Sequence, residues 1–510
     1  MLTEKRYLVG CRNSSIMPLA LEKKLIDFID RESNVKLLNK TRTGVHVLEM
    51  NPEIAEKLNA EEPLFIIEED LQLELFTRLP GINSVLTTDN ACPLVVTVID
   101  EETGLPVQQA DVYCFTPSVT MQVKTDAKGI AEITCCEKPM QKIIVVPKNT
   151  FWSKVVDSPE CQDGVVVIKL RKIPERRYNW IEQQMNLGEV RRFFTGNGIR
   201  IAIIDSGISP HESLFASGGY SPAFPDDQQG WAEDPDGHGT YCAGIIAGRN
   251  HLSGIAPDAE IFSVKIFPDA HFSDVVDAIN WCIDNHIDII NLGFGSIHYC
   301  SQIEIALHEA IQRGIVCVCA AGNHGAAVAF PASSPRTIAV SAVGKTGTFP
   351  VDSASSLSCP QQEQAELFFA EFSNRGAEID LCAPGVALVS SVPSGYASFD
   401  GTSTACAVIT ALSALVMEAF PEIKTGDYRQ SLAVKRLLKQ SSLDIGLPYS
   451  MQGSGYPDIY SLLKKSIAQK KREYATRKVL LKDLEYLHDK AVLCRDDINR
   501  VLSELGSISM

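Results

Sequence analysis

The chain has 510 residues, of which 45% are hydrophobic and 22% are charged, and its formal net charge is −16. A chain of this length and composition buries large cores and divides into about three domains. The acidic balance favours solubility and argues against a dominant basic patch of the kind that binds nucleic acid. The N-terminus lacks an apolar run with a small-residue cleavage site, and no uninterrupted apolar run of about 18 residues occurs. We therefore expect a cytoplasmic protein with no membrane span and no nucleic-acid partner.

The first segment, residues 1–88, has the order β-α-β-β-α-β between residues 6 and 75. Helical periods such as LALEKKLIDFID alternate with short apolar runs such as GVHVLEM and LFIIEED. This order predicts a small two-layer α+β unit of the ferredoxin-like kind.

The second segment, residues 92–173, loses the helical period. Short β-branched runs such as LVVTVID, ADVYCF and GVVVIKL are separated by turn residues. This pattern predicts a β-sandwich.

The third segment, residues 178–463, alternates strands with helices. IRIAIID, EIFSVKIF, IDIINLGF, GIVCVCAAGN and TIAVSAV are continuous apolar runs, as in strands that are covered on both faces. We predict an α/β domain with a parallel sheet and helices on both faces. The chain has fifteen cysteines, and those inside such runs are interpreted as reduced core residues.

The last segment, residues 464–510, is charged and helical. An unbroken 4-3 spacing connects its apolar residues, which are Leu480, Leu484, Leu487, Ala491, Cys494, Ile498, Val501 and Leu505. This seam predicts pairing with another helix, either in an oligomer or partner protein or on the chain's own third segment.

Four polar residues of the third segment are candidates for chemistry. Asp205 ends the strand IRIAIID, at the edge where open α/β sheets place their ligands. His238 stands among glycines in DPDGHGTYCAG, and Asn323 directly follows GIVCVCAAG. Ser403, in FDGTSTACAV, precedes a helical pattern and is expected to be its N-cap. Each of them alone also fits a structural role in a turn, a packed core or a helix cap.

In the order Asp205, His238, Asn323 and Ser403, these motifs resemble the subtilisin family of serine proteases. The words DSGI, HGT, AAGN and GTS match as well. The resemblance implies a triad in which Asp205 orients His238 and His238 activates Ser403. Asn323 is the implied donor to the oxyanion.

The resemblance also implies where a protein or peptide substrate binds. NLGFG is the expected pairing strand, and small or apolar residues are the expected walls of the pocket for the residue before the scissile bond. The implied substrate-binding residues are Gly293, Phe294, Gly295, Ala320, Ala321, Gly322, Ala329 and Phe330.

We expect no cofactor and no metal. The loop AGRNHLSGIAP is short and Ser213 stands where the family's strong calcium site has an aspartate, so the resemblance argues against that site. The acidic run Asp226, Asp227, Glu233, Asp234 and Asp236 is interpreted as a solvated loop.

The first segment resembles the subtilisin propeptide, whose final strand ends in an acidic phrase such as IIEEDLQLELF. We expect a zymogen that is inhibited by its own propeptide and cuts itself once between Phe76 and Thr77. An unrelated ferredoxin-like module is the alternative. The second segment resembles carboxypeptidase-regulatory sandwiches, which leaves open a spacer, a docking module or an exosite. A scaffold without activity and a peptide ligase remain as alternatives to a protease.

Overall fold

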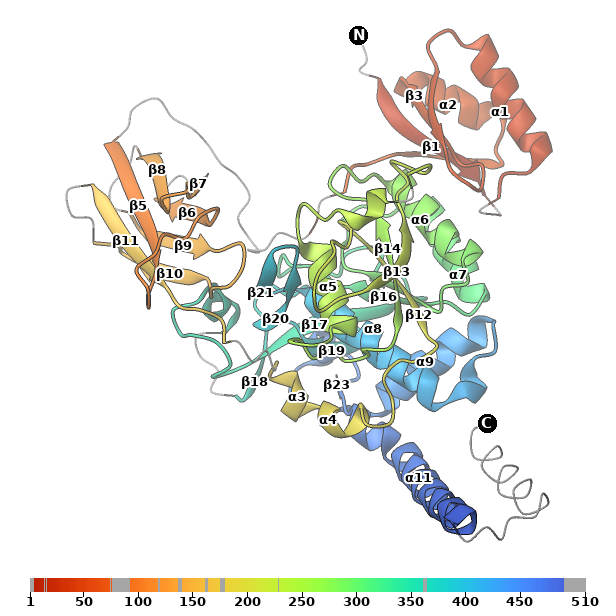
Figure 1. Ribbon diagram of the computed structural model, residues 1–510. Helices are drawn as coiled ribbons and strands as arrows, with labels where there is room; N and C mark the ends of the chain where they lie inside the picture. The colour runs from red at the N-terminus through yellow and green to blue at the C-terminus, as the bar shows by residue number, and fades with distance from the viewer. Residues whose placement is uncertain are drawn as a thin grey trace.

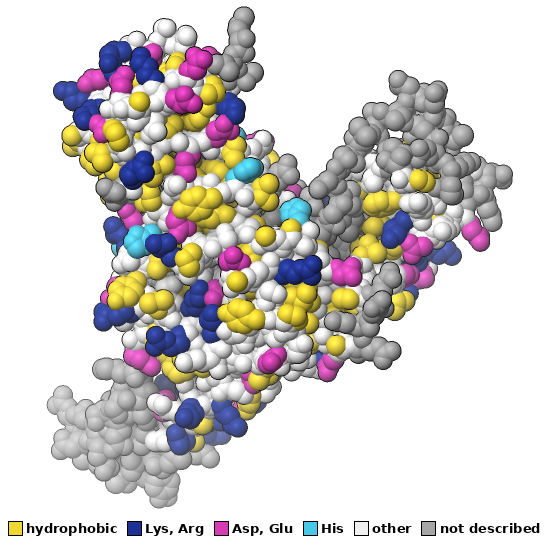
Figure 2. Space-filling view, turned by 180° about the vertical axis from the view of Figure 1, so that it is seen from behind, with side chains coloured by type: hydrophobic (Ala, Val, Ile, Leu, Met, Phe, Trp, Pro, Cys, Tyr) yellow, Lys and Arg dark blue, Asp and Glu magenta, His cyan; other side chains and the backbone are white. Residues whose placement is uncertain are grey.

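The computed structural model describes residues 4–12, 14, 16–73, 75, 92–117, 120–135, 140–160, 164–174, 179–227, 229–360 and 365–489. Figure 1 shows a large central body, with a small N-terminal unit and a β-rich unit attached at separate places and a long helix projecting near the C-terminus. Figure 2 shows from behind that a notch separates the two attached units, and that charges of both signs are interspersed over the central body.

The N-terminal unit is a four-stranded sheet with two helices on one face. Its elements are β1 (Lys5–Cys11), α1 (Leu19–Arg31), β2 (Lys36–Lys40), β3 (His46–Met50), α2 (Pro52–Glu61) and β4 (Phe65–Glu69). The strand order is β2-β3-β1-β4, and all pairs are antiparallel. One face packs on α1 and α2 through residues such as Leu25 and Phe28, while Leu8 and Val47 of the other face join the core of the central body.

The β-rich unit consists of two sheets around one core. Its strands are β5 (Cys92–Asp100), β6 (Asp111–Phe115), β7 (Thr120–Lys124), β8 (Ile130–Cys135), β9 (Lys142–Val146), β10 (Lys154–Asp157) and β11 (Val165–Leu170). The sheets have the orders β10-β9-β6-β7 and β11-β5-β8. Alternate residues of both sheets, such as Val112 and Val166, meet in the core between them. The short strand β10 was not expected from the sequence.

The central body is built on an eight-stranded sheet. Its strands are β12 (Arg200–Asp205), β13 (Ala216–Tyr220), β14 (Glu260–Lys265), β15 (Ile289–Leu292), β16 (Val316–Ala320), β17 (Ile338–Lys345), β18 (Leu367–Phe369) and β19 (Leu381–Pro384). The order is β13-β14-β12-β15-β16-β17-β18, and β19 also pairs with β17. The prediction of an all-parallel sheet was wrong in one respect, because β18 is antiparallel to β17.

Helices cover both faces of this sheet. The helices are α3 (Ile181–Gln184), α4 (Leu187–Val190), α5 (His238–Ala247), α6 (Phe272–Asp284), α7 (Ser301–Gln312), α8 (Thr402–Ala419), α9 (Tyr428–Gln440), α10 (Tyr449–Gln452) and α11 (Ile459–Asp489). Short 3-10 turns occur at Gly230–Ala232, Ala354–Ser358 and Pro421–Ile423. The core on one face includes α5, α8 and α9, and the core on the other face includes α6 and α7.

Two antiparallel ribbons complete the central body. They are β20 (Leu388–Val392) with β21 (Gly395–Phe399), and β22 (Ser442–Leu443) with β23 (Tyr456–Pro457). The β20–β21 ribbon leads directly into the start of α8.

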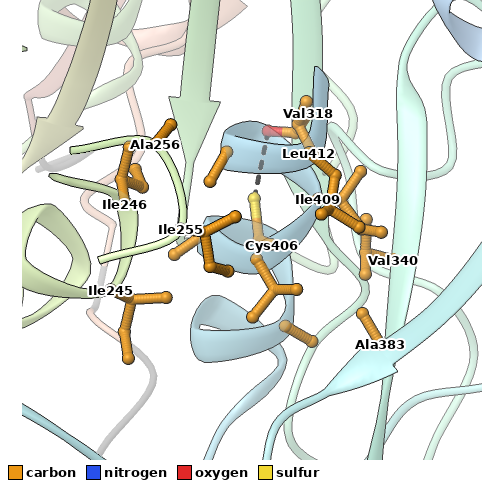
Figure 3. Close-up of a cluster of buried hydrophobic side chains, with 14 of the residues drawn as sticks. Ile245, Ile246, Ile255, Ala256, Val318, Val340, Ala383, Cys406, Ile409 and Leu412 are labelled. Carbon is orange, nitrogen blue, oxygen red and sulfur yellow. Dashed lines mark hydrogen bonds between the residues drawn. The ribbon is translucent and has the colours of Figure 1, made fainter. Parts of the chain in front are cut away.

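Helix α8 is the central helix of the buried layer. It is long and apolar enough to cross a membrane by length and composition, but 89% of it is buried inside the protein. Cys406 of α8 packs among Ile255, Val340 and Ile409 and donates from its thiol to the Val318 carbonyl, 3.3 Å away (Figure 3). Nine of the ten cysteines whose state is described are buried, as expected for reduced core residues.

The C-terminal helix does not follow the predicted boundary at residue 463. Helix α11 begins at Ile459, and its first turns place Ile459, Leu463 and Ile467 in the core. The helix is therefore continuous from the central body into the projecting tail. The predicted 4-3 seam from Leu480 to Leu505 lies outside the residues whose side chains are described.

Candidate active site

Three of the predicted residues form one hydrogen-bonded chain. Asp205 ends β12, His238 begins α5, and Ser403 lies in the first turn of α8. Nδ1 of His238 lies 2.8 Å from Oδ1 of Asp205, and Nε2 of His238 lies 2.8 Å from Oγ of Ser403. All three residues are buried. This arrangement can pass the hydroxyl proton to the imidazole while the carboxylate holds the ring.

The prediction that Ser403 is the N-cap of its helix was wrong. Gly401 is the N-cap, and α8 begins at Thr402. A Cβ atom on Gly401 would lie 2.9 Å from Oγ of Ser403, so a larger residue there would crowd the hydroxyl. Ser403 therefore stands inside the first turn, where the N–H groups at the start of the helix favour negative charge.

Asn323 directs its amide group toward Ser403. Its Oδ1 accepts from the backbone N–H of Thr402 at 2.9 Å and from the Thr402 hydroxyl at 2.8 Å. Because the N–H only donates, the carbonyl oxygen of Asn323 must face Thr402, and its NH₂ group faces away. Nδ2 of Asn323 and Oγ of Ser403 lie 3.3 and 2.9 Å from one point, the ideal Cβ position of Gly401. The donor and the hydroxyl therefore face the same space.

Thr402 is a functional residue that the sequence analysis missed. It fixes Asn323 through two bonds, and its Oγ1 accepts from the N–H of Gly322 at 3.0 Å. Gly322 has φ of +111°, and a Cβ there would meet Asn374 at 2.2 Å, so only glycine fits before Asn323. The sequence could have indicated Thr402, because it is the threonine of the GTS motif.

The acidic run was only partly a solvated loop, because Asp234 is buried. Its carboxylate accepts from Thr240 and from the N–H of Gly237, and it also accepts from the Ser206 hydroxyl at 2.8 Å. Burial raises the pKa of Asp234, although these hydrogen bonds oppose the shift. Oγ of Ser206 also lies 3.1 Å from Oδ1 of Asp205. Asp234 thus holds the start of α5 and touches the residue that supports Asp205.

Cys242 lies one helical turn after His238, with Sγ 4.0 Å from Nδ1 of the ring. Asp205, His238 and Cys242 offer ligand atoms within 4.8 Å of one another, and they are the one such group among the described residues. Burial raises the pKa of the Cys242 thiol, so it stays protonated near neutral pH. A metal ion at this place would compete with the hydrogen bonds of the triad.

Burial by itself lowers the pKa of His238, but the adjacent Asp205 carboxylate outweighs this effect and holds the pKa well above its usual value. A protonated imidazole cannot accept the Ser403 proton. We therefore expect kcat/KM to rise with pH through a single limb above about 6.5, the pKa of free histidine. Initial rates between pH 5 and 10 test this, and a limb below pH 6 would contradict it.

The eight predicted substrate-binding residues differ in exposure, and Gly293 lies against the triad. A Cβ on Gly293 would lie 3.2 Å from Oδ2 of Asp205 and 3.4 Å from Cβ of Ser403. Phe294 is buried against Phe267, and Gly295 is partly exposed. Four more of the eight residues are buried. They are Ala320, Ala321, Ala329 and Phe330. Main-chain bonds join Ala329 to Ala321 and Phe330 to Ser296.

A cavity of about 710 Å³ opens beside His238. None of the eight predicted residues is among the described residues that line it. Leu73 and Leu75 of the N-terminal segment, Phe267 of the central body and residues of the sandwich line it instead. Sequence reasoning missed this wall because its parts are distant in the chain.

A model of the subtilase family matches residues 196–457, just over half of the chain, and this range contains all four predicted catalytic residues. The chain belongs to the subtilase family. The resemblance found in the sequence is thereby confirmed.

This subtilase is 32% identical to subtilisin E of Bacillus subtilis (strain 168) over 252 residues. The aligned region covers 47% of this chain and 60% of subtilisin E. Subtilisin of Bacillus pumilus has the same identity over the same length and is covered to 84%. The chain thus spans only about 60% of the length of several curated relatives. Fervidolysin of Fervidobacterium pennivorans, a keratinolytic enzyme related to subtilisin, shares the fold with a TM-score of 0.57 and 19% identity, over 91% of this chain and 61% of fervidolysin.

Proposed function

We propose that this subtilase is a serine endopeptidase that hydrolyses peptide bonds through an acyl-enzyme. The single observation that carries the proposal is His238, bonded at Nδ1 to Asp205 and at Nε2 to Ser403. Oγ of Ser403 attacks the peptide carbonyl while His238 takes its proton, and Asp205 stabilises the imidazolium. The amide of Asn323 donates to the oxyanion. His238 then protonates the leaving amine, and water releases the acyl group by the same route.

In this proposal residues 178–463 are the catalytic domain, 92–173 a sandwich domain, 1–88 an inhibitory propeptide and 464–510 a helical tail. The substrates are proteins or peptides. Incubating the pure protein with a peptide library and determining product masses tests the reaction. Shorter products support an endopeptidase, joined products indicate a ligase, and unchanged peptides indicate a scaffold without activity.

The N-terminal unit docks through two carboxylates at the starts of two helices. Glu68 accepts from the N–H groups of Ser301 and Gln302 at 2.9 and 3.2 Å, at the start of α7. Asp70 accepts from the N–H and hydroxyl of Ser273 at 2.9 Å, in the first turn of α6. Negative charge is stabilised at helix N-termini, so both contacts favour docking.

From this docked unit the chain runs into the active-site cavity. Leu73 donates its N–H to the Ala270 carbonyl at 2.7 Å, and Phe272 donates to the Leu71 carbonyl at 3.1 Å. Leu73 and Leu75 then line the same cavity as His238. A strand held in this way occupies space that a substrate needs, and its covalent tether gives it a high effective concentration. This supports self-inhibition.

We expect the wild-type chain to cut itself once, near Phe76. Phe76 and Thr77 lie outside the described residues, but they directly follow the segment that enters the cavity. N-terminal sequencing of purified wild type and Ser403→Ala tests the expectation. A new N-terminus near Thr77 in the wild type alone supports it.

Two variants are designed to weaken the docking of the N-terminal unit and leave the residues of the triad unchanged. In Glu68→Gln and Asp70→Asn the carboxylate charge at a helix start is lost while an acceptor oxygen remains. If the N-terminal unit inhibits, both variants should reach full activity sooner than the wild type. An intact and fully active wild-type chain would rule out both the cleavage and the inhibition.

A further inference from the structure

The outer face of one sandwich sheet is turned toward the catalytic domain. Strand β9 is apolar on both faces: Ile143 and Val145 belong to the sandwich core, while Ile144 and Val146 point the other way. These two outward residues pack on Ala354 of the catalytic domain. The sandwich is therefore docked by an apolar contact, and the rest of the same face continues beyond it.

Hydrogen bonds fix the docked sandwich close to the nucleophile. Nδ2 of Asn149 donates to the Ser394 carbonyl at 2.8 Å, and the N–H of Thr150 donates to the Tyr396 carbonyl at 2.7 Å. Tyr396 lies in β21, and the chain continues from β21 directly to Ser403. These two bonds to the carbonyls of Ser394 and Tyr396 hold the sandwich in a defined place relative to the triad.

Beyond the apolar contact the same outer face becomes polar and lines the cavity that contains His238. On the catalytic side the cavity is bounded by Asp236 and Asp269, among others. On the sandwich side it is lined by Gln109, Asp111, Tyr113, Gln122, Lys124 and Lys148. Strands β6 and β7 alternate, so that Val112 and Met121 face the sandwich core while their neighbours face the cavity.

We infer that this face of the sandwich is a wall of the substrate cleft on the side of the residues before the scissile bond, and that Lys148 binds a carboxylate side chain of the substrate there. The inference rests on the proposed function. A substrate that replaces the strand of Leu73 and Leu75 lies in the space that the sandwich bounds. Because residues 92–173 follow the expected cut near Phe76, the wall remains part of the processed enzyme.

The charges on the sandwich side and the catalytic side of the cavity favour Lys148 as the residue that binds a substrate carboxylate. Lys124 is neutralised by Asp111, whose carboxylate lies 2.7 Å from its ammonium group. Lys148 is exposed, and the described part of the chain places no ion-pair partner beside it. The carboxylates of Asp236 and Asp269 lie on the opposite wall. An acidic side chain of the substrate is thus attracted to the sandwich and repelled from the catalytic side.

The test compares peptides that differ only before the scissile bond, with Glu or Lys placed at the second, third or fourth position from it. An exposed ion pair changes kcat/KM by up to about fivefold. We expect the wild type to prefer Glu by about this factor at one position, and Lys148→Glu to reverse the preference. Lys148→Arg should retain it. The matched control is Lys169→Glu, which makes the same charge change on an exposed residue of β11, in the other sheet.

A reporter substrate with only uncharged residues before the scissile bond separates specificity from folding. All variants should cut it at the wild-type rate. An unchanged Glu-to-Lys ratio in Lys148→Glu, with normal cutting of the reporter, would overturn this inference and leave the proposed function standing. Failure of the wild type to cut any peptide would overturn the proposed function and, with it, this inference.

Discussion

Replacing Ser403 with alanine is expected to lower kcat by about a million-fold, the effect of removing the nucleophile from a serine-protease triad. Oγ of Ser403 is the only atom that accepts the acyl group in the proposed mechanism, and without it His238 has no hydroxyl proton to take. Residual turnover should then come only from substrate binding and from the Asn323 amide. Steady-state hydrolysis of a peptide cut by the wild type measures the effect.

Ser413→Ala is the matched control for this variant. Ser413 lies in the same helix, is fully buried, and donates its hydroxyl to the Ile409 carbonyl at 2.8 Å. The substitution removes the same atom from α8 away from the triad, so activity should stay near the wild-type level. Comparable losses in both variants would mean that Ser403→Ala acts through folding. Retained activity in Ser403→Ala would assign the nucleophile to another residue.

Asn323→Asp is expected to lower kcat by about 10²- to 10³-fold and to change KM little, because the donor acts on charge that develops only in the transition state. The carboxylate keeps an acceptor for the two donors of Thr402, so the local bonds are conserved. What the variant loses is the NH₂ group that faces the space beside Ser403. Separate determination of kcat and KM checks the prediction.

Thr402 provides a graded comparison for this result. Thr402→Ser retains a hydroxyl that can donate to Asn323 and should be close to the wild type, whereas Thr402→Val loses one of the two bonds that hold the amide. We expect Thr402→Val to lie between the wild type and Asn323→Asp in kcat. If Asn323→Asp instead raised KM at constant kcat, Asn323 would bind the ground state and would not stabilise an oxyanion.

The sequence by itself predicted five of the eight strands of the central sheet, the β-α-β-β-α-β order and the residues of the triad. These features depend on local patterns. An apolar run covered on both faces, or a strand ending in a polar residue, is readable within about ten residues. The order of the motifs around Asp205, His238 and Ser403 along the chain indicated the subtilisin family, and the family match confirms that resemblance. The structure then brought these three side chains within hydrogen-bond distance.

Other features were decided only by the tertiary structure. Asp234 is polar in an acidic run, yet burial and bonds to Thr240 and Ser206 make it a support of the triad. The sandwich was visible as strands, but its place beside His238 depends on contacts such as that of Val146 with Ala354, which are about 200 residues apart. Hydrophobic periodicity predicts which face of a helix or strand is buried, but it does not predict which other element covers that face. Lys148 therefore becomes part of a cleft only when packing across the chain places the sandwich there.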